Sequence, residues 1–260
     1  MVALPSSLVT ATWLAQHLGS VMVLDASWHM PATKRDAKAE FEQAHIPSAR
    51  FFDIDANSAT DTYLPHMLPS SEAFAAAIGQ LGITNDDAVV VYDTEGLFSA
   101  ARLWRMFRIF GHENVAVLDG GLPAWQAAGH ATESGQPPAA HPSVFNATFQ
   151  RALVRDCAEV KTALIKPDIQ VIDARSHARF SGEEKDPRPG IRSGHIPGSR
   201  SLPFQRLAEN GSLKDISALR HIFSEFALED RPVITSCGSG VTAAAISLAL
   251  ETIGHPSHAL

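Results

Sequence analysis

The sequence predicts an α/β protein made of two tandem domains of one kind, each with a mostly parallel sheet flanked by helices. Three observations support this prediction. Residues 21–25, VMVLD, are repeated in residues 169–173, IQVID, as short apolar runs that end in Asp. Each half alternates β-branched runs with helix-like periodic runs, and this βαβα order is typical of a parallel sheet covered on both faces. A length of 260 residues, 45% of them hydrophobic, suits two domains of ordinary size.

The first half shows the order of elements most clearly. The apolar spacing of SSEAFAAAIGQLG predicts a helix over residues 70–82 that stops at Gly82. The elements expected after it are a strand over 88–93, a helix over 98–111, a strand over 114–119, and a Gly-Gly turn into a last helix at 120–129.

The repeat continues along both halves. Residues 89–96, VVVYDTEG, match residues 232–240, PVITSCGSG, which places Thr94 opposite Cys237. The Pro-rich stretch between the halves is typical of a linker. We therefore predict domains over residues 1–130 and 148–260, joined by a linker over 131–147.

Composition excludes several classes of function. The net charge of −7 repels a phosphate backbone, which argues against a nucleic-acid partner. The longest apolar run, residues 241–250, is shorter than the roughly 20 residues of a membrane span, and the N-terminus shows no targeting pattern, so a cytoplasmic location is expected. Two cysteines exclude a disulfide framework and an all-cysteine zinc site, and no metal is expected.

The chemistry is expected in the loop after the strand at 233–235. Cys237 stands there at the carboxyl end of a parallel strand, and Gly238 and Gly240 allow positive φ and a close approach of backbone N–H groups. Such a loop favours a thiolate or a persulfide at Cys237. The alternative is a buried structural cysteine in a Gly-rich turn. Cys157 lies in a helical stretch without glycine and is predicted to be a packing residue.

These motifs resemble the two-domain sulfurtransferases of the rhodanese superfamily, most closely their 3-mercaptopyruvate branch. The resemblance depends on CGSGVT at 237–242, HIPS at 45, GHIPG at 194, DAR at 173–175, FFDID at 51–55, PHMLP at 65–69 and LDGGLPAW at 118–125. It implies two tandem rhodanese-like domains, a catalytic C-terminal domain, an N-terminal domain without the cysteine, and no cofactor.

The resemblance also suggests the substrate. Thiosulfate enzymes of the superfamily carry basic side chains after the cysteine, whereas this loop has none. An insertion, SGEEKDPRPGIRSG, adds Arg188 and Arg192 to the second half, and Arg179 replaces Glu40. The resemblance assigns Arg179 and Arg188 to the carboxylate and keto oxygen of 3-mercaptopyruvate, and a guanidinium suits such a planar target. Further substrate contacts are expected from the loop residues Gly238, Gly240, Val241 and Thr242.

Alternatives remain for these arginines. The insertion also carries four other charged residues, so the alternative, which is less favoured, is a solvated charged loop. Arg175 and Arg192 are predicted to be structural ion-pair residues.

An acid–base group is expected from the first half. By resemblance, Asp55 orients His66, and His66 addresses Ser239 in a relay that protonates the departing enolate. The alternative is that His66 caps or packs the domain interface. His45 and His195 recur in both halves and are predicted to serve the fold.

The resemblance implies that Cys237 takes sulfur from 3-mercaptopyruvate, releases pyruvate, and passes the sulfur from a persulfide to cyanide or to a thiol acceptor such as thioredoxin. The alternatives are a thiosulfate:cyanide sulfurtransferase and a catalytically silent rhodanese-like binding module. A cysteine phosphatase is disfavoured, because Ala243 stands where its phosphate-binding arginine would be.

The repeat also predicts a feature of the C-terminal end. The sequence given reaches Leu260, just before the counterpart of residues 118–129. Either the chain is a shortened form, or residues 258–260 end as a ragged, partly unpaired strand beside exposed apolar sheet surface.

Overall fold

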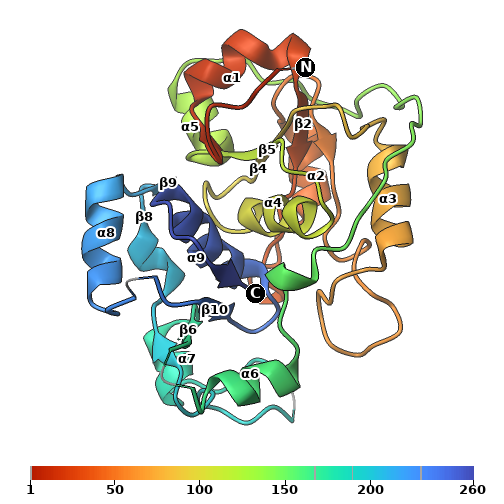
Figure 1. Cartoon of the computed structure of the whole chain (residues 1–260). Coiled ribbons are helices and arrows are strands. Elements are labelled where there is room, and N and C mark those ends of the chain that lie inside the picture. Colours follow the sequence, from red (N-terminus) through yellow and green to blue (C-terminus); the bar gives the residue numbers. More distant parts are fainter. Residues whose placement is uncertain (1, 167, 189, 229) are drawn as a thin grey trace. The chain divides into compact units, whose positions relative to one another are not determined.

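The computed structural model describes residues 2–166, 168–188, 190–228 and 230–260. It divides into two compact units, which we call unit 1 (Met1–Gln150 and Asn210–Leu213) and unit 2 (Arg151–Glu209 and Lys214–Leu260). Each unit has a parallel sheet with helices packed against it, which confirms the predicted fold class (Figure 1).

The sheet of unit 1 has five parallel strands in the order β1-β5-β4-β2-β3. Their sequences are rich in Val and Leu, as is usual for strands buried on both faces. The strands are β1 (Leu8–Val9), β2 (Met22–Asp25), β3 (Arg50–Phe51), β4 (Val89–Tyr92) and β5 (Val115–Leu118).

Helices cover both faces of this sheet. The helices of unit 1 are α1 (Ala11–His17), α2 (Ala37–Gln43), α3 (Ser71–Gln80), α4 (Ala100–Ile109) and α5 (Gly121–Ala127), with short 3₁₀ turns at Leu18–Ser20 and Pro31–Thr33. Val90 and Tyr92 of β4 belong to one apolar cluster with Leu14, Phe41 and Trp125, from α1, α2 and α5. Because side chains alternate along a strand, Val89 and Val91 face the other way, where α4 packs on β4 and β5.

Capping residues and glycines in the sequence mark the ends of these helices. Ser70 caps α3, since its Oγ accepts the Ala73 N–H at 3.2 Å, and Gly82 just beyond the helix has a φ of +72°. Gly120, at φ +76°, turns the chain from β5 into α5. The expected elements of the first half are thus confirmed.

The predicted linker, residues 131–147, is extended and lies along unit 1. Ser143 N–H donates to the Gly79 carbonyl at 2.9 Å, and Phe145 packs edge-on against Phe74 at 6.0 Å. A β-carbon on Gly79 would lie 2.6 Å from the Ser143 oxygen, so glycine is required for this approach. The domain limits 1–130 and 148–260 stay a prediction.

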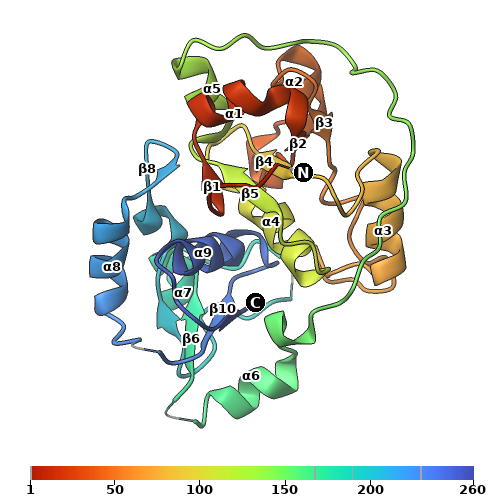
Figure 2. The ribbon, with the colours of Figure 1, turned by 45° about the horizontal axis from the view of Figure 1, so that its top comes forward.

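Unit 2 repeats this plan with four parallel strands in the order β11-β10-β6-β7 (Figure 2). Its strands are β6 (Gln170–Asp173), β7 (Arg200–Ser201), β10 (Val233–Ser236) and β11 (His258–Ala259). Its helices are α6 (Cys157–Ala163), α7 (His177–Ser181), α8 (Ile216–Ser224) and α9 (Val241–Thr252), with 3₁₀ turns at Arg151–Leu153 and Phe204–Leu207. The remaining short strands are β8 (Ala208–Glu209) and β9 (Ser212–Leu213), of which β9 belongs to unit 1.

The end of the chain corrects one prediction. β11 pairs with β10, and Leu260 bonds on its other side, since its N–H donates to Leu153 O at 3.0 Å and its carbonyl accepts the Arg155 N–H at 2.9 Å. The expected ragged, unpaired strand is therefore wrong, because the segment before α6 continues the sheet beyond β11.

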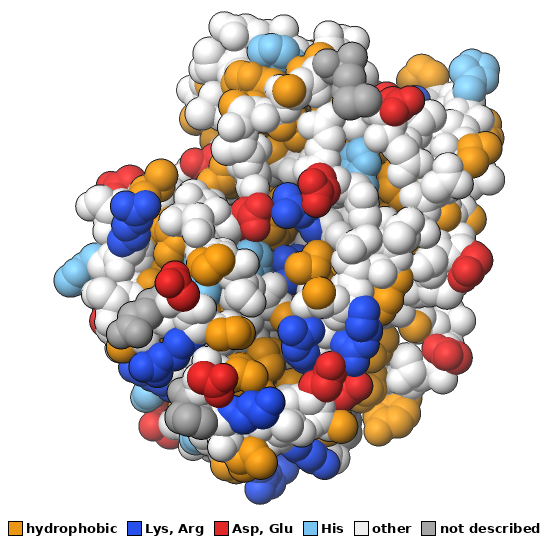
Figure 3. All heavy atoms as spheres, in the orientation of Figure 1, with side chains coloured by type: hydrophobic (Ala, Val, Ile, Leu, Met, Phe, Trp, Pro, Cys, Tyr) orange, Lys and Arg blue, Asp and Glu red, His pale blue; other side chains and the backbone are white. Residues whose placement is uncertain are grey.

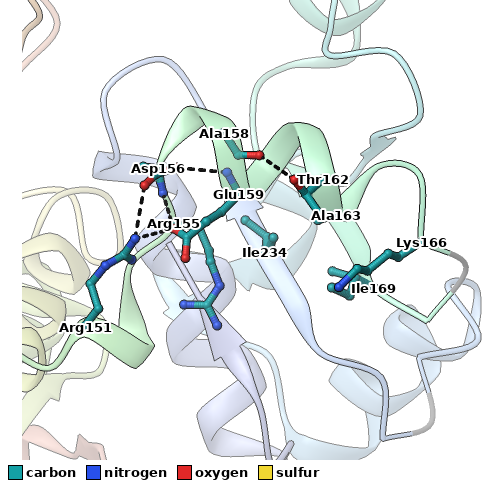
Figure 4. Close-up of a pocket in the computed structure, with 10 residues that line it drawn as sticks. All are labelled: Arg151, Arg155, Asp156, Ala158, Glu159, Thr162, Ala163, Lys166, Ile169 and Ile234. Atoms are coloured by element: carbon teal, nitrogen blue, oxygen red, sulfur yellow. Dashed lines mark hydrogen bonds and ion pairs between the residues drawn. The ribbon is translucent and has the colours of Figure 1, made fainter.

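A pocket of about 430 Å³ lies beside α6. Figure 4 shows Arg151 and Arg155 at one end and Lys166 and Ile169 at the other, with Ile234 between them. Among the residues that the structure describes, the apolar cluster on this face has Ala163, Val171 and Ile234 as buried members, far fewer than its counterpart in unit 1. Among the described residues of unit 2, no helix after β11 covers this face as α5 covers the sheet of unit 1.

The surface carries mixed charge. Figure 3 shows Lys and Arg side chains interspersed with Asp and Glu over the visible face, which agrees with the modest net charge of −7. Within the described residues, no helix is both long and apolar enough to cross a membrane.

Candidate active site

The Cys237 loop has the geometry of an anion site. Cys237 follows β10 directly and is half-buried, and Gly240 N–H donates to its Sγ at 3.0 Å. Gly240 caps α9 with φ +82° and ψ −2°, so it supplies the predicted positive φ. Gly238 does not lie in the left-handed region, and the expectation of a positive φ there is wrong. The turn before the helix needs only one left-handed residue.

Strand register identifies the residue of unit 1 that matches Cys237. Asp25 of β2 pairs with Tyr92, and Asp173 of β6 pairs with Ser236, so the residues after these strands, Asp93 and Cys237, are equivalent. The expected match of Cys237 with Thr94 is therefore wrong by one position. From Tyr92 to Gly111, unit 1 has one residue more than unit 2 has from Ser236 to Gly254. Sequence comparison alone could not show where in this stretch the extra residue lies.

The Asp93 carboxylate accepts the backbone N–H groups of its loop. Its Oδ1 accepts the N–H groups of Glu95 and Gly96 at 2.9 and 2.7 Å. Its Oδ2 accepts those of Phe98, Ser99 and Ala100 at 2.8 to 2.9 Å. In unit 1 a buried carboxylate thus takes up the converging backbone donors of the loop.

Arg179 and Arg188 meet beside the cysteine loop. Arg188 Nη1 donates to the Gly238 carbonyl at 2.9 Å, and a β-carbon on Gly238 would lie 3.5 Å from Arg179 Nη2 and 3.9 Å from Arg188 Nη2. Both guanidinium groups bond Asp186, from Arg179 Nη2 at 2.9 Å and from Arg188 Nε at 3.1 Å. The structure brings these two predicted substrate arginines together with Cys237, rather than leaving them on a solvated loop.

Asp186 is the residue that organises the pair. Its side chain is only 1% exposed. Burial opposes its ionisation, but the hydrogen bonds from Arg188 and Arg179 outweigh burial, so the pKa of Asp186 lies well below its usual range. It is therefore a fixed negative charge that orients both arginines.

Two further arginines were predicted to form ion pairs. Arg175 does so, with Nη2 at 2.6 Å from the buried Asp173, and this prediction is confirmed. Arg192 is exposed and has no ion pair among the residues that the structure describes, so the prediction is wrong for Arg192.

The predicted role of Cys157 as a packing residue is also wrong. It is the first residue of α6 and is exposed, and hence it is not a packing residue. The sequence pattern assigned Cys157 to a helix but did not establish on which face of the helix it lies.

The remaining loop residues differ in what they can offer. Val241 is 2% exposed in the core, so only its backbone faces the loop. Ser239 and Thr242 are half-buried. In the described part of the chain, no group of three or more His, Cys, Asp or Glu side chains could hold a metal.

Unit 1 brings Asp55 and His66 together. His66 Nε2 lies 2.6 Å from Asp55 Oδ1, as the sequence analysis expected of this pair. His66 has a φ of +55°, and Arg102 Nη2 donates to its carbonyl at 2.6 Å. Burial lowers the pKa of His66 and Arg102 lowers it further, while Asp55 opposes both. The imidazole is thus held neutral more readily than a free histidine.

The two repeated histidines share one structural role. His45 Nδ1 lies 2.8 Å from the Phe41 carbonyl and stacks on the Phe41 ring, and His195 does the same with Phe180. This contact joins each helix to the loop that follows it, as expected of fold residues.

Sequence reasoning missed Asp186 and Trp28. Asp186 looked like one member of a charged run, although its place two residues before Arg188 was a usable signal. Trp28 Nε1 donates to Asp55 at 3.1 Å, a contact across 27 residues that no local pattern reveals.

Comparison with known proteins identifies the family of this chain. The family described as "Rhodanese-like domain" matches residues 10–128 and 156–260. The chain belongs to the rhodanese family.

Relatives in this rhodanese family are similar over almost the whole chain. It is 44% identical to thiosulfate/3-mercaptopyruvate sulfurtransferase 1, mitochondrial, of Arabidopsis thaliana, over 95% of this chain and 71% of that protein. It is 43% identical to 3-mercaptopyruvate sulfurtransferase of Escherichia coli, over 96% and 90%. The crystal structure of SseA from Escherichia coli, described as a 3-mercaptopyruvate sulfotransferase with the rhodanese fold, superposes with a TM-score of 0.90 at 41% identity and covers 98% and 97% of the two chains.

Proposed function

We propose that this rhodanese-family chain takes sulfur from 3-mercaptopyruvate through a Cys237 persulfide and passes it to a thiol acceptor such as thioredoxin, or to cyanide. The chain is a sulfurtransferase, since close relatives with that activity in their names match it over nearly its full length. The observation that supports the keto-acid donor is the pair Arg179 and Arg188 beside the Cys237 loop.

The first half-reaction follows from the loop. The Cys237 thiolate attacks the substrate sulfur, an S–S bond forms, and the C–S bond breaks with its electron pair left on carbon as the pyruvate enolate. Gly240 N–H, 3.0 Å from Sγ, stabilises negative charge on the sulfur. The substrate thiol gives up its proton as the persulfide forms, and we propose that the Asp55–His66 pair, with Ser239 as the hydroxyl of the relay, accepts this proton and transfers it to the enolate carbon to give pyruvate.

The arginines select the substrate. The carboxylate and keto oxygens of 3-mercaptopyruvate form a planar target, and two guanidinium groups fixed by one buried Asp186 present donors in a fixed arrangement. The backbone of Gly238, Gly240 and Val241 and the hydroxyl of Thr242 complete the proposed substrate contacts. No cofactor takes part in this scheme.

In the second half-reaction an acceptor thiolate or cyanide attacks the outer sulfur of the persulfide, and the Cys237 thiolate leaves. This covalent intermediate predicts a two-step ping-pong pattern. A cytoplasmic location and thioredoxin as acceptor stay predictions.

The test compares two donors at equal enzyme concentration. Pyruvate release from 3-mercaptopyruvate is measured beside thiocyanate formation from thiosulfate and cyanide. We expect the higher kcat/KM for 3-mercaptopyruvate. A higher value for thiosulfate would contradict the proposed donor and favour the thiosulfate:cyanide reaction.

A further inference from the structure

Trp28 lies three residues after β2 and contacts both members of the Asp55–His66 pair. Its indole Nε1–H donates to Asp55 Oδ1 and to Oδ2, each at 3.1 Å. Its ring meets the imidazole of His66 edge to face, with centroids 4.8 Å apart and planes at 83°. All three residues belong to unit 1.

Asp55 needs such a partner. Its side chain is 65% exposed, on a loop without regular structure, so its carboxylate would otherwise rotate in solvent. A shared indole donor fixes the plane of the carboxylate and leaves Oδ1 toward His66 Nε2 at 2.6 Å. The direction of the imidazole is then set by the indole through the carboxylate.

Trp28 is itself anchored. Its backbone N–H donates to Ser99 Oγ at 3.0 Å, and its ring stacks on Phe98 with centroids 6.0 Å apart. These contacts fix the position of Trp28, so its indole N–H determines the orientation of the Asp55 carboxylate and not the reverse.

The hydrogen bond from His66 to the Asp55 carboxylate determines which imidazole nitrogen is available for proton exchange. With Nε2 bound to Asp55, His66 Nδ1 is the remaining nitrogen, and it is buried with no hydrogen-bond partner among the described residues. A buried nitrogen without a partner is costly, and in the proposed function this nitrogen is the one that exchanges the proton.

We infer that Trp28 is a positioning residue for proton delivery by His66, acting through the Asp55 carboxylate. The inference rests on the proposed function, in which the enolate that leaves 3-mercaptopyruvate must be protonated. Attack on the preformed persulfide breaks an S–S bond and releases a thiolate, so it needs no proton on carbon. Trp28 therefore affects the first half-reaction and spares the second.

The test is Trp28→Phe, which keeps an aromatic ring beside His66 and Phe98 and removes the indole N–H donor together with the second ring of the indole. We expect the rate of pyruvate release in a single turnover to fall about tenfold or more, as for loss of a hydrogen bond to a charged group. Transfer of sulfur from the persulfidated variant to cyanide should change less than twofold. Equal losses in both half-reactions, or no loss in either, would overturn the inference.

Trp13→Phe is the matched control. Trp13 is another half-buried tryptophan of unit 1, stacked on His17, and is expected to leave both half-reactions unchanged. Loss of pyruvate release in this control as well would assign the Trp28 effect to the packing of unit 1 and contradict the inference.

Asp55→Asn separates this inference from the proposed function. If Asp55→Asn slows pyruvate release and Trp28→Phe adds no further loss to it, both residues act on one step, as inferred. If Asp55→Asn alone slows it and Trp28→Phe does not, the role of Trp28 is wrong and the proposed function stands. If Asp55→Asn has no effect, the proposed Asp55–His66 relay is wrong, and the inference with it.

Discussion

Cys237 and Asp93 occupy the same position in the two units, each directly after the last residue of the equivalent strand. The Asp93 carboxylate accepts five backbone N–H groups in its loop, and the Cys237 sulfur accepts the N–H of Gly240. The same place in the fold is therefore occupied by the Asp93 carboxylate in unit 1 and by the proposed nucleophile in unit 2. This equivalence is an argument, independent of any motif, that the loop can stabilise negative charge that develops at the position of the Cys237 sulfur.

The two glycines of the Cys237 loop should respond differently to substitution. Gly240→Ala forces a non-glycine residue to φ +82° and moves the N–H that contacts Sγ, and backbone strain of this kind costs about 1–3 kcal/mol. We expect a large fall in kcat and a lower free energy of unfolding. Gly238→Ala needs no positive φ, so it should lower the free energy of unfolding much less, although its methyl group, 3.5 Å from Arg179, can change substrate binding. Equal losses in the free energy of unfolding for both changes would contradict the assigned loop geometry.

The three charged residues beside the loop should act on substrate affinity. Arg179→Ala and Arg188→Ala are each expected to raise the KM for 3-mercaptopyruvate by about tenfold or more, because a charge-assisted hydrogen bond contributes about 1.5–3 kcal/mol. Asp186→Asn should raise it too, since both guanidinium groups lose their common partner. Arg192→Ala, an exposed arginine of the same insertion, is expected to change the KM less than twofold. A comparable rise for Arg192→Ala would indicate that the insertion acts only through its overall charge.

Asp25 should make the stability of the fold depend on pH. Burial raises the pKa of this carboxyl from 3.8 to about 6, and repulsion by Asp93 adds to the effect, while hydrogen bonds from Ser27 oppose it. A raised pKa means that the folded state holds the proton more tightly, so the stabilising contribution is complete below pH 3.8 and is lost as pH rises through about 6.

We therefore expect Asp25→Asn, which keeps the group neutral, to remove this pH dependence. The difference in free energy of unfolding between Asp25→Asn and the unmodified chain should shift in favour of the variant by about 2 kcal/mol between pH 4 and pH 7. The measurement is urea denaturation at several pH values. A difference that stays constant with pH would show that Asp25 is ionised in the folded chain throughout.

The pocket beside α6 should accept an element like α5. In unit 1, Trp125 is 1% exposed in the cluster that contains Val90, and strand register places Ile234 at the position of Val90. A chain extended after Leu260 by a copy of residues 118–129 is expected to be more stable, because burial of a large side chain contributes about 1.5–3 kcal/mol. The same extension with Ala in place of its Trp is the control. Equal denaturation midpoints for both extended chains would mean that the pocket does not bind the tryptophan.

The sequence predicted what depends on local pattern. The period of apolar residues located α3, α4 and β4, and the order of strand, cysteine, glycines and helix located the Cys237 loop. What it missed depends on contacts between distant residues. The indole donor of Trp28 to Asp55 and the part that Asp186 plays between two arginines arise only when loops fold together. Cys157 and Gly238 were misjudged because a pattern assigns an element, but not the orientation of its first residue or the φ of one glycine.

The most direct test of the central claim is to locate the transferred sulfur. The chain is incubated with 3-mercaptopyruvate without an acceptor, digested, and its two cysteine peptides are analysed by mass spectrometry. We predict one added sulfur atom on the Cys237 peptide, its removal by cyanide with formation of thiocyanate, and no stable addition on the exposed Cys157. Stable sulfur on the Cys157 peptide with an unmodified Cys237 would contradict the account.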